Sequence, residues 1–261
     1  MTSYEIDSVT RAVRVLQALA DGSGGRGVSE LGRGLGLGKA SVFRVLRTLS
    51  ELGLVQQDVE TRQYRLGPEL IPLGQAAAEA TDLRGVARPV MEHLSRDTRM
   101  PCYLNVPGDR DVVCLEHVQS LAQIDLYGRA GHTMPYHACP SGLVLLAFGP
   151  PERLERVLRL GLRRYGRGTI VGRRAMRAAL VEIRARGYAF GIDDLEDGVT
   201  SVAAPICDVH GAVVAALGLA GFSHMFDGRQ EAMIAAVEAA AMQISTARRR
   251  PAVGSSSGAA V

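Results

Sequence analysis

A glycine turn between two short amphipathic segments constrains the fold of this chain most. Gly-Leu-Gly at 36–38 separates the segments, and glycine permits the positive φ angles that a tight turn needs. The second segment, Ala40–Leu52, is followed by Gly53, a residue typical of helix ends. Its apolar side chains recur at helical spacing and form one stripe: Val42, Val45, Leu46, Leu49 and Leu52. The pattern predicts a helix-turn-helix.

The flanking segments extend this motif into a small domain. Ser8 is placed to cap a preceding helix, and Ser29 to cap the first helix of the motif. The preceding helix carries apolar residues at helical spacing: Val9, Val13, Leu16 and Leu19. Two extended runs, 54–57 and 62–66, follow the motif and predict a hairpin. We therefore expect residues 1–67 to form a winged helix-turn-helix.

The second helix of the motif carries hydroxyl and cationic side chains on its outward face. Arg44 and Arg47 are three residues apart and project from adjacent turns. The major groove of DNA admits an α-helix, and Arg suits bidentate contact with guanine or phosphate. We expect double-stranded operator DNA to be bound by Lys39, Ser41, Arg44, Arg47, Thr48 and, in the hairpin, Arg62. The alternative is a small helical bundle whose arginines only face water.

The pattern changes after residue 67. Pro68 fits the first turn of a linker helix over 68–82, and a further helix is expected over 83–98. Apolar runs then alternate with helical segments, which predicts an α+β domain over 83–249. The expected strands are 103–106, 112–118, 123–127, 199–206 and 212–220. The expected helices are 137–148, 151–162, 173–186 and 230–248, followed by a disordered tail at 250–261.

Composition excludes several classes of protein. Hydrophobic residues make up 47% of the chain, which is typical of a globular protein. No run of about 18 apolar residues occurs, and the N-terminus lacks a secretory pattern, so we expect a cytoplasmic protein without a membrane partner. The four cysteines show no CxxC spacing, which fits a reducing compartment. We expect no disulfide scaffold, no metal and no cofactor.

A candidate ligand site lies at 137–142, where His-Ala-Cys-Pro-Ser-Gly stands at the predicted start of a helix. Unpaired amides and the positive end of the helix dipole favour a carboxylate there. An apolar pocket with a few polar anchors suits a small organic effector. The candidate pocket residues, including an apolar wall, are Leu126, Met134, His137, Cys139, Pro140, Ser141 and Gly142.

Other interpretations of this segment stay open. Cys139 at a helix start beside His137 is a candidate nucleophile, although residues i and i+2 of a regular helix do not face each other. Cys139 with His137 or His132 is a candidate metal site that lacks further ligands at helpful spacing. The simplest alternative is that these residues only pack a helix against a sheet. The competing function is an enzyme or sensor module whose N-terminal domain binds protein.

Two charged segments also allow more than one role. The acidic run Asp193, Asp194, Glu196 and Asp197 either holds a cation, orients the pocket backbone or forms a solvated turn. The basic stretch at 163–186 is typical of a solvated helix face with a loop.

Seven segments resemble the IclR-type bacterial transcriptional regulators. The first three are SVTRAVRVLQAL, VSELGRGLGLGKASVFRVLRTLSELGLV and YRLGPELIPLG. The others are RPVMEHLSRDT, MPYHACPSGLVLLA, RGYAFGIDDLEDGVTSVAAPI and GAVVAALGLAG. The resemblance covers about residues 8–245 and keeps the family's order and spacing.

This resemblance implies a linker helix between the winged helix and a GAF-like or profilin-like effector-binding domain. It implies a homodimer formed through the N-terminal domain, often as a dimer of dimers. The implied effectors are small organic acids or aromatic compounds. The recognition helix falls on Lys39–Leu52, and the implied pocket gains Gly191, Ser201, Gly218 and Ala220.

The sequence departs from the family at this pocket. Gly142-Leu143 stands where the family commonly has Gly-Lys. In a family member that binds small carboxylates, polar side chains occupy the four added positions, of which only Ser201 keeps a hydroxyl here. We therefore expect an effector that is larger or less polar than a two- or three-carbon acid.

Overall fold

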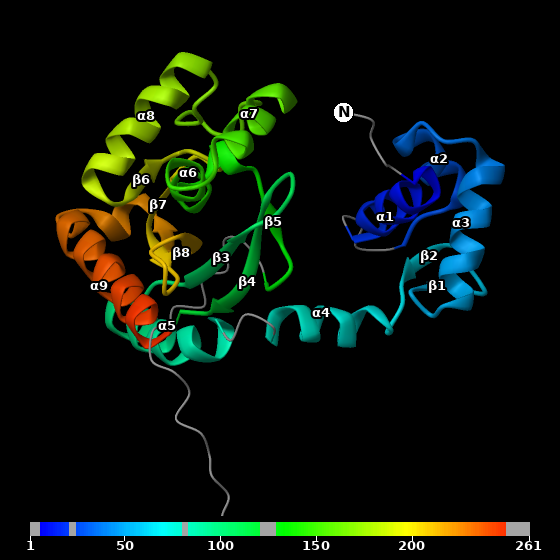
Figure 1. Ribbon diagram of the computed structural model, residues 1–261, viewed down its shortest axis with the longest axis horizontal. Coiled ribbons are helices and arrows are strands. Elements are labelled where there is room, and N and C mark those ends of the chain that lie inside the picture. Colours follow the sequence, from blue (N-terminus) through cyan, green and yellow to red (C-terminus); the bar gives the residue numbers. More distant parts are fainter. Residues whose placement is uncertain (1–5, 21–24, 80–82, 121–128, 249–261) are drawn as a thin grey trace, which may run out of the picture. The chain divides into compact units, whose positions relative to one another are not determined.

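The protein is described by a computed structural model of residues 6–20, 25–79, 83–120 and 129–248 (Figure 1). The chain divides into two compact units, Met1–Ala80 and Thr81–Val261. Within the described ranges, no helix has the length and apolar character needed to cross a membrane.

The first unit is built from helices and one hairpin. Its elements are α1 (Asp7–Ala20), α2 (Val28–Leu35), α3 (Lys39–Glu51), β1 (Val55–Gln57), β2 (Tyr64–Leu66) and α4 (Leu70–Glu79). Strands β1 and β2 pair antiparallel. Gly36 ends α2 at φ 66° and Gly53 follows α3 at φ 69°, so both glycines adopt the left-handed conformation that their positions predict. The predicted winged helix-turn-helix is confirmed.

The core of the first unit lies where α1, α3 and the hairpin meet. Its buried members are Val15, Leu19, Leu31, Val42, Leu46, Leu49, Val55 and Tyr64. Not every residue of the predicted apolar stripes joins this core. Val9 is 56% exposed and Val13 is 46% exposed, because α1 turns Val15 and Leu19 to the core and the earlier valines project from another side. Leu52 is 60% exposed, since it lies beyond the end of α3.

The predicted caps were wrong. Gly27 occupies the cap position of α2, so Ser29 lies inside its first turn. Helix α1 already includes Asp7, which places Ser8 inside that helix. Backbone geometry rather than a serine side chain therefore begins α2.

The second unit contains a sheet covered by helices on both faces. The strands are β3 (Cys102–Pro107), β4 (Val112–Val118), β5 (Thr133–Met134), β6 (Ala189–Ile192), β7 (Val199–Cys207) and β8 (Val213–Phe222). Among the described residues they form one antiparallel sheet in the order β5-β4-β3-β8-β7-β6. The helices are α5 (Leu83–Thr98), α6 (Pro140–Ala147), α7 (Pro151–Leu160), α8 (Arg173–Arg186) and α9 (Gln230–Arg248).

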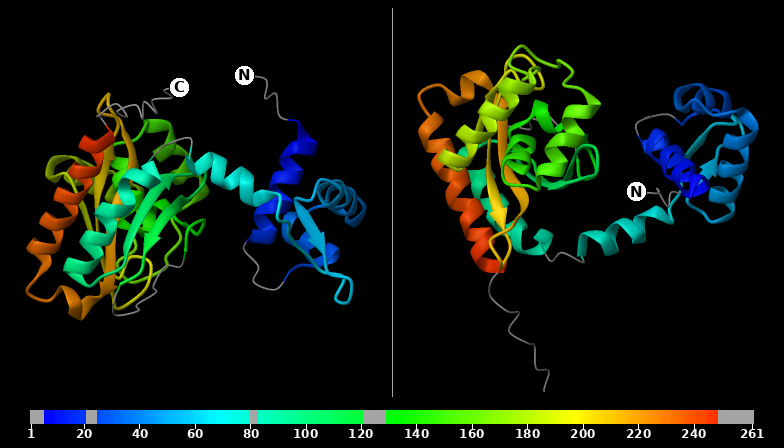
Figure 2. Two further views of the ribbon diagram at one scale, coloured as in Figure 1. Left: turned by 90° about the horizontal axis from the view of Figure 1, so that it is seen from below. Right: turned by 45° about the horizontal axis from the view of Figure 1, so that its top comes forward.

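Alternation along the strands supplies both faces of this sheet with apolar side chains. On β7, Val202 and Ala204 pack against α5 and α9, while Ala203 packs against α6 and α8. Figures 1 and 2 show α5 and α9 on one face and α6 to α8 on the other. This arrangement confirms the predicted α+β class.

Ion pairs between two half-exposed arginines of α5 and one buried carboxylate fasten α5 to the sheet. The Glu116 side chain on β4 is only 4% exposed, and its Oε2 lies 3.3 Å from Arg88 Nη1. Burial opposes ionisation of Glu116, but the Arg84 hydrogen bond and both arginine charges hold its pKa below the ordinary value. The register of the β3–β4 pair shifts between Leu104 and Asn105. Glu116 therefore pairs with Leu104, on the face of the sheet that α5 covers, and Cys114 pairs with Asn105.

Other predicted elements changed at their ends. The short strands β5 and β6 were not predicted, because their pairing depends on β4 and β7 rather than on local pattern. The predicted helix 137–148 is a 3₁₀ turn, Tyr136–Ala138, followed by α6. The predicted strand 123–127, the end of the linker helix at 80–82 and the tail at 250–261 lie outside the described residues.

Candidate nucleic-acid interface and effector pocket

Helix α3 presents a polar face opposite its buried stripe. Val42, Leu46 and Leu49 are buried in the unit's core, while Arg44 and Arg47 are exposed. Lys39 is exposed at the helix start, where Gly38 provides no side-chain cap. Such an end leaves amides and the positive dipole end open to a phosphate.

Both predicted DNA-binding hydroxyls, Ser41 and Thr48, lie at the side of α3 that faces α1. Ser41 is half-buried, and its Oγ accepts a hydrogen bond of 3.2 Å from Arg11 Nη1. Thr48 is exposed, and its Oγ1 donates to the Arg44 carbonyl oxygen at 3.2 Å. Arg47 forms an ion pair of 3.1 Å with Glu51. Arg44 is therefore the predicted arginine of α3 whose side chain has no ion pair within the described structure.

The hairpin presents Arg62 at its tip. Asp58 Oδ1 accepts hydrogen bonds from the amides of Glu60 and Thr61, and these bonds hold the pKa of Asp58 below its ordinary value. Arg62 follows in a left-handed conformation at φ 58°, outside β2, and its side chain is exposed. The tip thus combines one cation with exposed Val59 and Glu60.

An apolar groove of about 560 Å³ separates α1 from α3. Ser41, Arg44 and Thr48 form part of its α3 side. The exposed apolar side chains Val9, Val13 and Leu52 also line it. The exposed valines of α1 therefore share one surface with three of the predicted DNA-binding residues.

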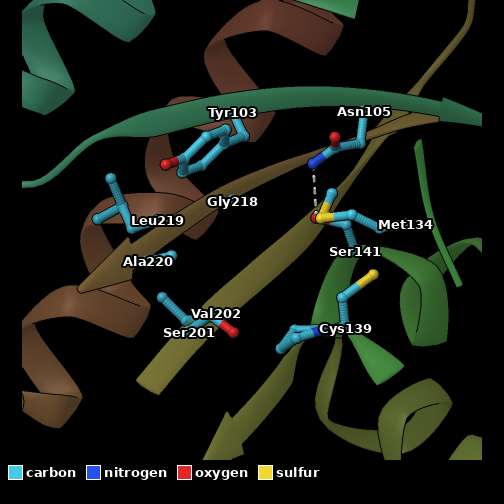
Figure 3. Close-up of a pocket in the computed structure, with 11 residues that line it drawn as sticks. Tyr103, Asn105, Met134, Cys139, Ser141, Ser201, Val202, Gly218, Leu219 and Ala220 are labelled. Atoms are coloured by element: carbon cyan, nitrogen blue, oxygen red, sulfur yellow. Dashed lines mark hydrogen bonds between the residues drawn. The ribbon is translucent and has the colours of Figure 1, made fainter. Parts of the chain in front are cut away.

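A small cavity in the second unit lies between the sheet and the start of α6 (Figure 3). Its volume of about 20 Å³ holds about one water molecule. Asn105 Nδ2 on β3 donates a 2.9 Å hydrogen bond to Ser141 Oγ on α6. Both side chains are buried, and Asn105 Oδ1 has no hydrogen-bond partner among the described residues. This oxygen is a free acceptor in a mostly apolar site.

The structure brings together most, but not all, of the predicted effector residues. Those that line the cavity are Met134, Cys139, Pro140, Ser141, Ser201, Gly218 and Ala220. Predicted residue Leu126 lies outside the described residues. Tyr103 and Asn105 also line the cavity and were missed. A signal for them exists in the sequence, since they alternate on a predicted strand and carry polar groups on the same face of it.

Three predicted pocket residues have other contacts. His137 Nε2 lies 2.8 Å from the Arg163 carbonyl oxygen, so the ring is engaged away from the cavity. Gly142 lets α6 approach the backbone of Tyr136, where a methyl group would overlap. Gly191 lies against the Asp194 carboxylate, and a methyl group on Gly191 would overlap that carboxylate. The structure places all three beside the cavity wall rather than on its lining.

The chemistry of Cys139 argues against a nucleophile. Burial raises the pKa of its thiol to about 12, so the neutral thiol prevails at ordinary pH. Its Sγ donates to the Pro135 carbonyl oxygen at 3.5 Å rather than to His137. Among the described residues, no group of three or more His, Cys, Asp or Glu side chains is arranged to hold a metal ion.

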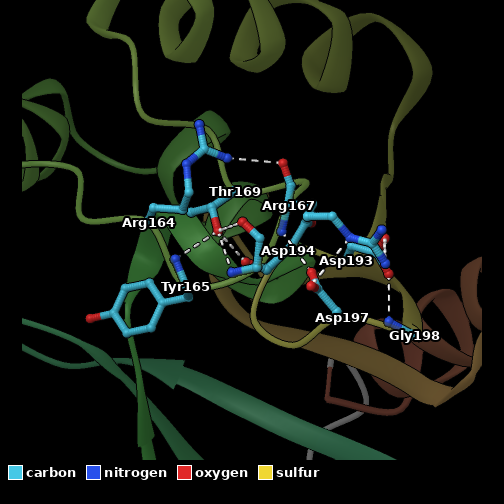
Figure 4. Close-up of polar contacts among 9 residues, drawn as sticks. Arg164, Tyr165, Arg167, Thr169, Asp193, Asp194, Asp197 and Gly198 are labelled. Carbon is cyan, nitrogen blue, oxygen red and sulfur yellow. Dashed lines mark hydrogen bonds and ion pairs between the residues drawn. The ribbon is translucent and has the colours of Figure 1, made fainter.

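The acidic run pairs with the basic loop before α8 (Figure 4). Arg167 approaches Asp193 at 3.7 Å and Asp197 at 3.2 Å. Thr169 Oγ1 donates to the Asp194 carbonyl oxygen at 2.6 Å, which holds the two loops together. Burial, followed by the charge of Asp193, raises the pKa of the Asp194 carboxyl to about 7. The acidic run therefore forms one half of a loop–loop contact, while Glu196 and Asp197 remain exposed.

A winged helix-turn-helix followed by an α+β unit with a mostly apolar cavity and a few polar anchors defines a DNA-binding protein with a separate ligand-binding domain. Residues 8–59 match the IclR helix-turn-helix domain. Residues 75–246 match the family described as bacterial transcriptional regulator IclR C-terminal. The chain belongs to the IclR family of DNA-binding transcriptional regulators.

Individual relatives agree with this assignment. The glycerol operon regulatory protein of Streptomyces griseus is 32% identical over 221 residues, which cover 83% of this chain and 85% of that protein. A crystal structure of an IclR homologue from Microbacterium hydrocarbonoxydans complexed with 4-hydroxybenzoate is 30% identical, with a TM-score of 0.77 over 93% of this chain and 99% of that one. A putative IclR regulator from Silicibacter sp. TM1040 has a TM-score of 0.84 at 28% identity, over 94% of this chain and 97% of that one.

Proposed function

We propose that α3 and the hairpin tip bind operator DNA, and that a small organic effector bound in the second unit changes this binding. The observation that carries the proposal is the exposure of Arg44 and Arg47 opposite the buried stripe of α3. The proposed DNA contacts are Lys39, Ser41, Arg44, Arg47, Thr48 and Arg62. Because such a regulator acts on chromosomal DNA, we place it in the cytoplasm.

A gel shift with the DNA upstream of the protein's own gene tests operator binding. We expect a sequence-specific complex whose affinity falls as salt rises, because phosphate contacts release counterions. A random duplex of equal length is the control. Failure to shift the upstream DNA even at low salt contradicts this proposal and favours a protein-binding N-terminal unit.

The effector we propose is an organic acid larger than three carbons, with an aromatic acid as the leading class. The start of α6, with the Ser141 hydroxyl as a donor, favours a carboxylate, and the unpartnered Asn105 Oδ1 suits a donor group elsewhere on the ligand. The relative crystallised with 4-hydroxybenzoate supports this class. Because the cavity holds about one water, the flexible Met134 side chain and other lining residues must move to admit a ring.

Thermal unfolding with a panel of acids tests the effector class. Benzoate and hydroxybenzoates are expected to raise the melting temperature, since a ligand that binds only the folded state stabilises it. Acetate and pyruvate at equal concentration are expected to leave it unchanged. The reverse order contradicts the proposed class.

We also propose a homodimer formed through the first unit, with a dimer of dimers as a further assembly. The exposed apolar side chains Val9 and Val13 on α1 support an interface there. Sedimentation equilibrium of the protein and of Val13→Asp tests this, because a charge in an apolar interface weakens association. A variant that associates like the parent protein contradicts an interface at α1.

A further inference from the structure

The outward face of α3 contains an aromatic side chain that the sequence analysis did not assign. Phe43 is 50% exposed. Ala40, Phe43, Arg44 and Arg47 are spaced i, i+3, i+4 and i+7, so they share the helix face opposite the buried stripe. All four are exposed. This face therefore has an apolar part near the helix start and a cationic part after it.

Phe43 is not part of the core of its own unit. It is absent from the core cluster of the first unit, both among the buried members and among the partly buried residues packed against them. The chain has only 5 phenylalanines and no tryptophan, and all five phenylalanines lie in the described ranges. Phe43 is the most exposed of them; Phe222 follows at 44% and Phe226 is 1% exposed. Phe43, one of few large aromatic residues in the chain, thus lies on a helix surface that faces water.

The surroundings of Phe43 indicate which partner covers it. Arg44 is adjacent, and Lys39 and Arg47 lie one helical turn away on either side. Cations around an apolar side chain suit a polyanion that also presents an apolar group. The major groove of DNA meets both conditions, because thymine places its C5-methyl group there and phenylalanine and alanine make apolar contact with that methyl. Residues near the start of a recognition helix are those that reach base edges.

We propose that Phe43, with Ala40 beside it, contacts the C5-methyl group of a thymine in the operator and makes that thymine a specificity position. This inference rests on the proposed binding of operator DNA by α3. It adds a hydrophobic contact to the polar readout assigned to Arg44 and Arg47. Phe43 is accordingly a specificity residue and contributes little to binding of random DNA.

Deoxyuridine substitution tests this contact, because uracil keeps the base pairing of thymine and lacks only the methyl group. The duplex is the one recovered when full-length protein selects from a random-sequence pool. Each thymine is replaced singly, and dissociation constants are measured for the parent protein, Phe43→Ala and Phe43→Gln. Val181→Ala is the matched control, because Val181 on α8 is 61% exposed and belongs to the second unit.

The parent protein and Val181→Ala are expected to lose about three- to fivefold in affinity at one thymine position, the effect of one buried methyl group. Phe43→Ala and Phe43→Gln are expected to bind the unmodified duplex more weakly and to be insensitive to the methyl at that position. Their affinity for random DNA and their melting temperatures are expected to match the parent. Agreement between the two variants guards against a folding defect in either one.

Two outcomes overturn the inference and can be told apart. If the pool yields an enriched site but the variants respond to every uracil as the parent does, Phe43 does not read thymine, and operator binding stands. If the parent protein enriches no sequence, both this inference and the proposed operator binding fail.

Discussion

Asn105 Nδ2 donates a 2.9 Å hydrogen bond to Ser141 Oγ, which joins the central strand β3 to the start of α6. The two residues are 36 positions apart in the sequence. Asn105 is 1% exposed and its Oδ1 lacks a partner among the described residues. An unpaired buried acceptor costs free energy, so a ligand that donates to it gains more than the same contact would give in water.

Loss of this hydrogen bond should lower stability in a coupled manner. Ser141→Ala and Asn105→Leu are each expected to cost about 1–3 kcal/mol of unfolding free energy, because each leaves a buried polar group unpaired. The double variant is expected to cost less than the sum, since it removes both groups. Urea unfolding followed by circular dichroism measures this, with Ser201→Ala as the control hydroxyl of the same cavity. Additive losses within about 0.3 kcal/mol would mean that the two side chains do not interact.

Arg44 should contribute to sequence-specific binding. Arg44→Ala is expected to weaken operator binding by about 1–3 kcal/mol if the guanidinium reads a base, with a much smaller loss on random DNA. Arg174→Ala on α8 removes the same charge from an exposed helix of the second unit and is the matched control. Fluorescence anisotropy on both duplexes gives the comparison. Equal losses on the two duplexes would show that Arg44 contacts only phosphate.

Asp194 should make stability depend on pH. Its folded pKa of about 7 lies above the usual aspartate value of about 3.9, so the folded state favours the protonated carboxyl. The stabilisation from this group is present at low pH and is lost as pH rises through 7. Asp194→Asn stays neutral and is expected to exceed the parent in stability at pH 8 but not at pH 4. Urea midpoints at the two pH values decide this, and a difference that is the same at both would refute the assignment.

Two glycine-to-alanine changes should have opposite effects. A methyl group on Gly142 would overlap the backbone of Tyr136, so Gly142→Ala is expected to lower stability by about 1–3 kcal/mol. Gly34 in α2 has open space around its Cβ position, so Gly34→Ala is expected to raise stability by about 0.5–1 kcal/mol through helix propensity. Melting temperatures test both, and a stable Gly142→Ala would mean that α6 can shift.

Prediction from the sequence succeeded where local pattern is strong. The expected helices at 173–186 and 230–248 have the bounds of α8 and α9, and the helix-turn-helix lies where the glycines place it. The short strands β5 and β6 were not predicted, because a strand of a few residues is stable only when it pairs with a neighbouring strand. Part of the cavity was found through the helix-start motif, whereas Tyr103 and Asn105 arrive from a distant strand.

The order of residues by itself determined that the chain has a DNA-binding motif and a separate α+β unit. Helical periodicity, glycine placement and the family's motifs are local features, and each can be read without knowledge of partners far along the chain. Tertiary structure alone decided which side chains meet. It turned Val9 and Val13 outward, directed His137 away from the cavity and joined Asn105 to Ser141. Such contacts depend on how distant segments pack, and packing geometry is not encoded in the spacing of any one segment.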